Sequence, residues 1–378
     1  MSKLLSTLNA GIASATDDLV RAEYQAKKAG YLARVGRFEE AQQLIAQLRS
    51  MFGDGRSPSV SVWTMLAEGL LHTYRDMADE GADRIMRANV LAGAMRDRPL
   101  IAATATWRAH LQSERSEFKG MARSLEDAFA NCKSDDHELL ARLYMTIGNA
   151  RMSVGSRAVA NELYMFARHH ALECGDQATI DALIYNKAAF ALAWMRARSC
   201  YGELDQDLIR QIRVEIASAK TYQQLADVGA LANFVFLWEA RLFLLSGEYD
   251  RAIPALESVQ YLQPFARYNY HASLVRLEVT YCQIRTAPAT VDREAVKAAV
   301  ETDFAGLHDD DKLVATWLKR EVLAAMPDLG DVSAVSRRLE AVQEEFDASC
   351  LALRNILDGL APQPHIRRPL VSMPKPQS

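Results

Sequence analysis

The sequence GEYDRAIPALESVQYLQP runs from Gly247 to Pro264. A glycine opens it, an aromatic residue follows at Tyr249, and a small residue, Ala252, comes three positions later. Apolar residues then recur at helical spacing until the proline closes the run. A residue as small as alanine at one fixed place on an otherwise apolar helix predicts that a second helix crosses there at close range.

The same order of residues recurs elsewhere in the chain. In the first helix before this stretch, Ala240 and Phe243 precede Gly247, Tyr249 and Ala252. Two other segments match it, with Ala29, Leu32, Gly36, Phe38 and Ala41 in one, and Tyr144, Gly148, Gly155, Ala160, Tyr164 and Ala167 in the other. This order resembles the tetratricopeptide (TPR) repeat, over roughly two-thirds of the chain. The resemblance implies an all-α, TPR-like α-solenoid, a right-handed superhelix of antiparallel helix pairs whose stacking buries a continuous core.

Helical periodicity extends over nearly the whole sequence, with short breaks between segments. The predicted helices cover residues 17–34, 37–52, 59–75, 78–96, 99–114, 118–132, 137–153, 156–174, 177–198, 204–220, 223–245, 248–262, 265–285, 291–305, 310–326 and 331–360. Prolines stand where these helices are expected to start or stop, at Pro58, Pro99, Pro264, Pro288 and Pro327. No segment alternates apolar and polar residues as a strand does, so we expect essentially no β-structure.

The chain divides into four predicted parts. Residues 1–16 form an N-terminal helical extension, 17–288 the solenoid, 289–360 the C-terminal helices, and 361–378 a proline-rich tail. We expect the tail to be disordered and dispensable for folding. Apolar residues between 332 and 360 follow a heptad-like spacing, which predicts either a helix that caps the open end of the solenoid or a seam for self-association or a partner helix.

Composition excludes some classes of function. The 378 residues are 49% hydrophobic and carry a net charge of −4, so neither a nucleic acid nor an anionic membrane is an expected partner. Five scattered cysteines without a CxxC pair indicate free thiols in a reducing cytoplasm. Polar residues at Ser6, Thr7 and Asn9 interrupt the first apolar run, so we do not expect a signal peptide, and no apolar run is long enough to span a membrane.

The motifs of common enzymes are missing from the sequence. It contains no GxxxxGK[ST], GxGxxG, GxSxG or HExxH, so we predict no catalytic residue, no metal site and no cofactor. The acidic run from His308 to Lys312 is interpreted as the charged start of a helix. In ALAWMRARSCYGE, Trp194 is interpreted as a core residue, and Arg196 and Arg198 as surface residues.

The resemblance also implies where a ligand would bind. In the TPR family the contact positions lie beside the small residue of the first helix, on the concave face. The matching residues here are Arg142, Met145, Asn149 and Met152 in one repeat, Phe234, Leu237 and Arg241 in another, and Asn186 and Lys187 between them. The family's clamp for a terminal carboxylate is absent, because Glu23, Ala26 and Gly30 occupy its places. The polar residues in this set should either face a groove or be hydrogen-bonded by a neighbouring helix.

Three functions remain open. The first is a non-catalytic scaffold or adaptor that binds a segment of a partner protein on the concave face. The second is a regulatory sensor module that responds to a peptide or small ligand and controls an effector, and the third is an enzyme with a site in the groove. An open groove favours the scaffold, whereas an enclosed pocket with converging polar groups favours the sensor.

Overall fold

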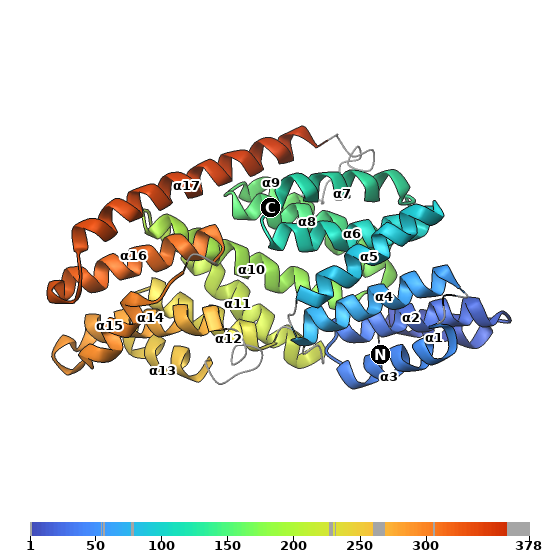
Figure 1. Cartoon of the computed structure of the whole chain (residues 1–378), viewed down its shortest axis with the longest axis horizontal. Coiled ribbons are helices and arrows are strands. Elements are labelled where there is room, and N and C mark those ends of the chain that lie inside the picture. Colours follow the sequence, from blue (N-terminus) through green and yellow to red (C-terminus); the bar gives the residue numbers. More distant parts are fainter. Residues whose placement is uncertain are drawn as a thin grey trace, which may run out of the picture.

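The computed structural model describes residues 2–53, 55, 57–76, 79–226, 230, 232–259, 269–304 and 307–360. Within these ranges the fold is all-α (Figure 1). Its α-helices are α1 (Lys3–Ser14), α2 (Asp18–Arg34), α3 (Phe38–Phe52), α4 (Pro58–Leu71), α5 (Asp79–Met95), α6 (Arg98–Glu114), α7 (Phe118–Asn131), α8 (His137–Ser153), α9 (Arg157–Cys174), α10 (Gln177–Ser199), α11 (Gln206–Ala226), α12 (Ala232–Leu245), α13 (Tyr249–Val259), α14 (Asn269–Thr286), α15 (Arg293–Glu301), α16 (Asp309–Ala325) and α17 (Val332–Gly359). A π-helical turn, η1 (His72–Asp76), extends α4, and two short 3₁₀ turns, η3 (Pro288–Thr290) and η4 (Pro327–Leu329), precede α15 and α17.

Successive helices pack against each other as antiparallel pairs, which confirms the predicted TPR-like solenoid. The three glycines aligned in the sequence, Gly36, Gly155 and Gly247, all adopt left-handed backbone conformations with φ of 87°, 75° and 73°. Each ends its helix in a Schellman motif. The closing bonds of these motifs run from Arg37 N to Leu32 O, from Ser156 N to Arg151 O and from Glu248 N to Phe243 O. The repeated glycine therefore specifies one turn geometry, which sets the angle at which each pair closes.

Helix starts follow the sequence signals. Asp17, Asp97 and Asp331 accept hydrogen bonds from backbone N–H groups of the helices that follow them, as N-cap residues do. Pro58 and Pro99 lie in the first turns of α4 and α6, where a missing N–H is harmless. The predicted break near residue 221 is wrong, because α11 continues to Ala226. The predicted helical residues 260–262 and 265–268 and the tail 361–378 lie outside the described residues.

The inner helices form a row whose centre is α10. In chain order α2, α4, α6, α8, α10 and α12 each contact the next member of the row, and α14 contacts α16. The row then turns back on itself, because α16 also packs against α10 (Figure 1). Helix α10 is buried around most of its circumference, and so is α8. The inner face of this solenoid is therefore covered by its own helices.

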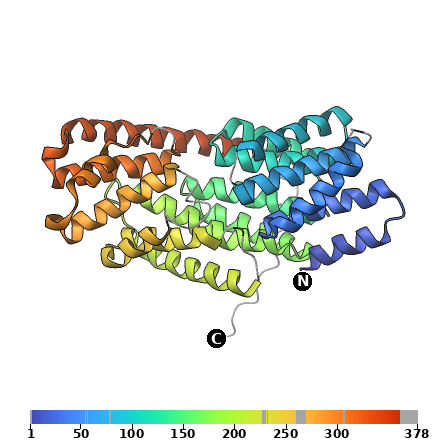
Figure 2. The same cartoon turned by 60° about the horizontal axis from the view of Figure 1, so that its bottom comes forward.

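The last helix, α17, closes the structure from outside. It packs against α16 and reaches back to α7 and α8, as Figures 1 and 2 show for the red helix. Its buried residues belong to the predicted heptad-like row and are Leu339, Val342, Phe346, Leu353 and Leu357. They join a continuous apolar core that extends from Ala105 in α6 to the end of α17. Self-association through the same side chains would require α17 to separate from the rest of its own chain, so the capping role accounts for this row. The domain boundary at residue 288 stays a prediction.

Ala252 lies at a helix crossing, fully buried between α12 and α13. We predict that Ala252→Leu lowers the free energy of unfolding by about 1–3 kcal/mol, because the larger side chain has no space to occupy. Chemical denaturation measures this change. Ala352→Leu, at an exposed position of α17, is the control and should change stability by less than about 0.5 kcal/mol. Equal effects at the two positions would contradict the repeat register.

Candidate functional site

Two clusters of buried charge lie at the two ends of α10. The first, which we call the N-terminal joint, consists of Arg34, Glu138, Arg142, Asp176 and Thr179. Arg34 Nη2 donates hydrogen bonds to Asp176 Oδ2 at 2.5 Å and to Thr179 Oγ1 at 2.6 Å. Its Nη1 contacts Glu138 Oε1 at 3.3 Å. One side chain of α2 thus ties the first helix pair to α8 and to the start of α10, across 142 residues of sequence.

The residue before α10 holds the joint together. Asp176 is its N-cap, and Asp176 Oδ1 accepts a hydrogen bond from Thr179 N at 3.0 Å. Its other oxygen accepts bonds from Arg34 and from the Thr179 hydroxyl. Burial opposes ionisation of this carboxyl, but the Arg34 guanidinium outweighs burial and lowers the pKa of Asp176. The joint therefore contains at least one carboxylate that stays charged at neutral pH.

Arg142 lies beside this pair but is bonded differently. Its guanidinium stacks on the Trp107 ring, with Cζ 4.2 Å from the ring centroid, and Arg34 Cζ lies 5.5 Å from the same centroid. Its bond to Thr179 Oγ1 is long, at 3.4 Å. Burial lowers the pKa of Arg142, and the nearby Arg34 charge acts in the same direction. Arg142 is thus a buried cation held mainly by an aromatic face and neutral oxygens.

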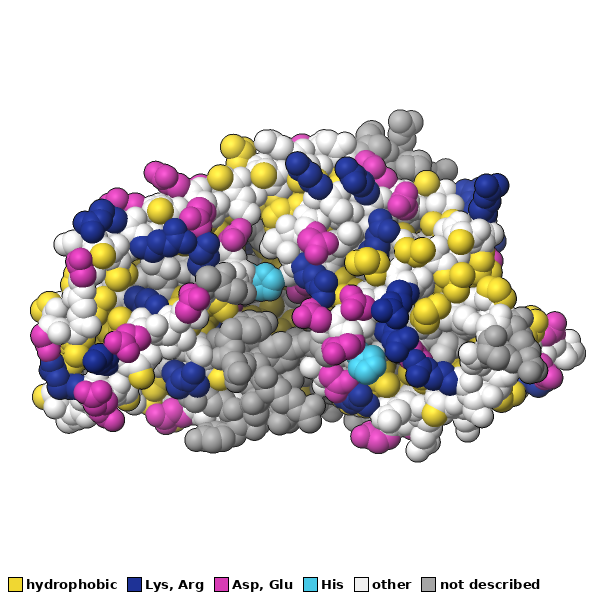
Figure 3. Space-filling view, in the orientation of Figure 1, with side chains coloured by type: hydrophobic (Ala, Val, Ile, Leu, Met, Phe, Trp, Pro, Cys, Tyr) yellow, Lys and Arg dark blue, Asp and Glu magenta, His cyan; other side chains and the backbone are white. Residues whose placement is uncertain are grey.

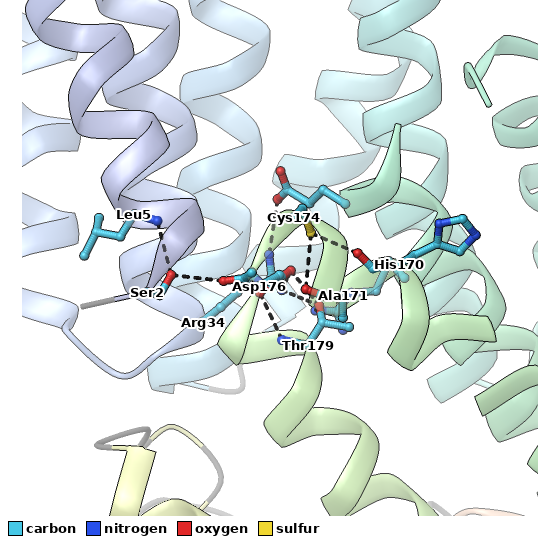
Figure 4. A network of polar contacts seen from close by, with 11 residues as sticks. Ser2, Leu5, Arg34, His170, Ala171, Cys174, Asp176 and Thr179 are labelled. Carbon is cyan, nitrogen blue, oxygen red and sulfur yellow. Dashed lines mark hydrogen bonds and ion pairs between the residues drawn. The ribbon is translucent and has the colours of Figure 1, made fainter. Parts of the chain in front are cut away.

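The N-terminal helix α1 covers the outside of this joint (Figure 4). Ser2 Oγ and Leu4 N both donate to the carbonyl of Gly175, and Lys3 Nζ donates to the carbonyl of Glu173 at 2.7 Å. Gly175 has φ of 70°, and a Cβ built on it would lie 2.4 Å from the Lys3 side chain. The turn between α9 and α10 is therefore fitted closely to α1, and α1 fixes the position of the residue that holds Arg34.

The second cluster, which we call the C-terminal joint, consists of Arg196, Arg241, Glu278 and Asp311, one from each of α10, α12, α14 and α16. Arg196 donates to Glu278 Oε1 at 2.5 Å and to Asp311 Oδ1 at 2.9 Å. Arg241 Nε lies 3.0 Å from Glu278 Oε1. Two guanidinium groups face two carboxyl groups, so each buried charge has a partner of opposite sign. This balance is the condition for burying charge at acceptable cost.

The structure buries the predicted partner-binding residues. Eight of them are at most 8% exposed, namely Arg142, Met145, Asn149, Met152, Asn186, Phe234, Leu237 and Arg241. Lys187 keeps more of its side chain in solvent and pairs with Glu215 at 2.9 Å. The expectation that this set lines an open groove does not fit these positions, because the inner helices pack against one another and α16 packs back against α10. Their role in partner binding stays a prediction, and it now requires access to a covered surface.

Two of these residues are bonded to a neighbouring helix instead of facing a groove. Asn149 accepts a hydrogen bond from the Tyr164 hydroxyl at 3.0 Å, and Arg241 pairs with Glu278, so both link neighbouring helices. Arg142 and Arg241 belong to different joints rather than to one surface. Only Arg142 lies beside partly exposed polar groups, because Glu138, one turn before it on α8, keeps 47% of its side chain exposed.

Several joint residues were not predicted. Arg196 was interpreted as a surface residue, and this interpretation is wrong, because only 3% of Arg196 is exposed. The interpretation of the acidic run at 308–312 as a helix start is correct, but Asp311 in addition points into the C-terminal joint. Glu278 could have been found from its surroundings, since Leu274, Leu277 and other apolar residues flank it at helical spacing. A lone charge on an apolar helix face indicates a buried ion pair.

The described surface carries charges of both signs. Figure 3 shows acidic and basic side chains interspersed over the visible face. Among the described residues, no group of three or more His, Cys, Asp or Glu side chains is placed to hold a metal ion. None of the described helices combines the length and the apolar character that crossing a membrane requires.

Comparisons with known proteins give little further information. No protein-family model and no curated protein matches the sequence. Among solved structures, the chain is similar to the apo form of the quorum sensor NprR from B. thuringiensis, with 13% sequence identity and a TM-score of 0.43. The similarity covers 93% of this chain and 92% of that one. A similarity at this level does not bear on ligand or partner, and the fold described above rests on the helices themselves.

The C-terminal joint yields a stability prediction. Glu278→Gln leaves two buried guanidinium groups with a single carboxylate, so we predict a loss of about 3–5 kcal/mol in the free energy of unfolding. Urea denaturation followed by circular dichroism measures it. Glu257→Gln, at an exposed position of α13, is the control and should cost less than about 0.5 kcal/mol. A loss at Glu278 no larger than the control would show that the joint is not a buried ion cluster.

A second prediction concerns Asp181, a buried residue of α10 whose neighbour is Gln223 of α11. Burial raises the pKa of Asp181 to about 7. Between about pH 4 and pH 7 the unfolded chain releases this proton while the folded chain keeps it, so the stability of the wild-type protein falls as pH rises. Asp181→Asn lacks this proton, and its stability relative to wild type should increase from pH 4 to pH 7 and stay constant above. Denaturation curves across this range measure the difference, and a difference that does not vary with pH would contradict the prediction.

Proposed function

We propose that this chain is a non-catalytic regulatory module of the TPR-like class, which binds a segment of a partner protein or a peptide in the cytoplasm. The observation that supports this proposal is the N-terminal joint. Three helix pairs contribute to this joint, through α2, α8 and α10. The joint includes Arg142, one of the ligand-contact positions that the family resemblance implies.

The joint can couple binding to a change in packing. Arg34 holds α2 against Asp176, and its second contact, to Glu138, is longer and lies at the solvent boundary. A ligand that engages this boundary competes for the same donors, and it thereby changes the free energy with which α2 is held against α8 and α10. A ligand shifts a conformational equilibrium by its difference in affinity for the two states. These features favour a sensor over a passive scaffold.

A second candidate function is the adaptor, and one surface favours it. On α5, Met86 and Val90 are 45% and 67% exposed, and together with Leu91 and Ala94 they line a shallow depression. An exposed apolar strip of this kind is a common docking position for a partner helix. It belongs to the outer helix of its pair and contains none of the predicted contact residues.

One experiment separates the two candidates. The full-length chain is used to capture partners from a lysate of its native host, and hydrogen exchange is then measured on the chain with and without the captured partner. The regulatory module predicts altered exchange in α2, α8 and the start of α10. Val90→Asp should leave the affinity for the partner unchanged. Altered exchange confined to α5, with loss of capture by Val90→Asp, would overturn the regulatory module and support the adaptor.

A further inference from the structure

The described part of the chain contains four deeply buried arginines that differ in their partners, and Arg34 is the one that pairs with Asp176 at 2.5 Å. Arg196 and Arg241, in the C-terminal joint, each lie within 3.0 Å of a carboxylate oxygen. Arg142 is equally buried, at 3% exposed, but within the described part of the chain no carboxylate oxygen lies within 4.0 Å of its guanidinium. A buried charge without a counter-ion is costly, so this difference calls for a physical explanation.

Unused polar atoms gather around the same guanidinium. Nε of Arg142, Nε of Arg34 and Nδ1 of His110 are all buried without a hydrogen-bond partner among the described residues. The His110 ring lies 5.8 Å from the Trp107 ring, on which both guanidinium groups lie. Burial, together with the two arginine charges, lowers the pKa of His110 to about 3, so this imidazole is neutral at physiological pH. Arg241 likewise leaves Nη1 and Nη2 without a hydrogen-bond partner, but it has the Glu278 carboxylate beside it. Unpaired polar atoms around a guanidinium that has no carboxylate within reach indicate a polar ligand group that completes them.

We propose that the N-terminal joint binds a carboxylate group of the partner segment through Arg142, with Trp107 beneath the guanidinium and Glu138 at the entrance. This inference rests on the proposed function and names the chemistry of its ligand. Planar guanidinium groups recognise carboxylates through paired, charge-assisted hydrogen bonds. Either a chain terminus or an acidic side chain supplies the same group.

The charge of the joint favours a carboxylate over a phosphate. Arg34 and Arg142 contribute two positive charges, and Asp176, which pairs with Arg34, contributes one negative charge. Glu138 at the entrance supplies the second negative charge, so a monoanion that displaces Glu138 keeps the joint balanced. A phosphate dianion in place of Glu138 would exceed this balance and would face repulsion from Asp176. The site therefore selects a single negative charge.

Glu138 lies at the solvent-facing side of the site, where a ligand would enter. It lies one helical turn before Arg142 on α8, contacts Arg34 at 3.3 Å, and is the partly exposed member of the joint. Its carboxyl group is the nearest internal competitor for an incoming carboxylate. Binding of the ligand would displace Glu138 from Arg34, which links occupancy of the site to the position of α2.

The test uses three capped dipeptides as probes: acetyl-Gly-Gly with a free C-terminal carboxylate, acetyl-Glu-Gly amide with a side-chain carboxylate, and acetyl-Gly-Gly amide with neither. The readout is the indole N–H signal of Trp107 in the full-length chain, assigned by Trp107→Phe. At least one carboxylate probe should shift this signal saturably, and the amide should not. Which of the two carboxylate probes binds tells a chain terminus from an acidic side chain. Saturation by neither, or an equal response to inorganic phosphate, would overturn the proposal.

Variants locate the response. Arg142→Gln should abolish it, and Glu138→Gln should strengthen carboxylate binding several-fold by removing the internal competitor. Arg151→Gln is the matched control, because Arg151 lies on the same helix and pairs with Asp358 at 2.5 Å, away from the joint. A wild-type response in Arg142→Gln would overturn the proposal. If that variant does not fold, unchanged affinity in Glu138→Gln would do so.

The outcomes separate this inference from the proposed function. If the partner binds wild type and Arg142→Gln equally, the carboxylate site fails while the regulatory module stands. If the probes bind as expected but no partner alters exchange in α2, α8 or α10, the site stands and the proposed function fails.

Discussion

The structure depends on ion pairs at the two ends of one helix. At the start of α10, its N-cap residue Asp176 pairs with Arg34 of α2. Near the end of α10, Arg196 pairs with Glu278 of α14 and with Asp311 of α16. A buried guanidinium fixes its neighbours because any displacement leaves a charge without a partner. Helices that are distant in sequence are thereby held at defined positions around α10. A row of helix pairs that could have remained open is closed on itself.

This closure changes how the inner face can function. In an open solenoid the first helices present their side chains to a ligand, whereas here α8 and α10 are covered on nearly all sides. Access to the predicted contact residues is confined to places where a joint reaches the surface. The N-terminal joint does so at Glu138. It combines a guanidinium that has no carboxylate in direct contact, that of Arg142, with a helix contact that a ligand can weaken. A module of this kind responds to its partner by repacking, which fits regulation better than passive docking.

Local features of the fold could be predicted from the sequence, but its closure could not. The turn glycines Gly36, Gly155 and Gly247 and the small residue Ala252 act within one helix pair, so their spacing was sufficient to place the pairs and the crossing. The ion pairs of α10 join residues 142 and 82 positions apart, and such pairs leave no periodic signal. The sequence pattern around an arginine that becomes buried does not differ from the pattern around an exposed one. The candidate site was therefore found only in part, through Arg142, whose position beside the small residue was local information.

The Arg34–Asp176 pair is the contact that holds the first helix pair against α10. The most direct test is a double-mutant cycle with Arg34→Met, Asp176→Asn and the double variant, measured by urea denaturation. Each single change leaves one buried partner unsatisfied, so we expect the double variant to cost less than the sum of the singles by about 2 kcal/mol or more. The exposed pair of Arg21 and Asp18 is the reference, with an expected coupling below about 1 kcal/mol. Additive costs for Arg34 and Asp176 would show that α2 is held by apolar packing alone and would contradict the account.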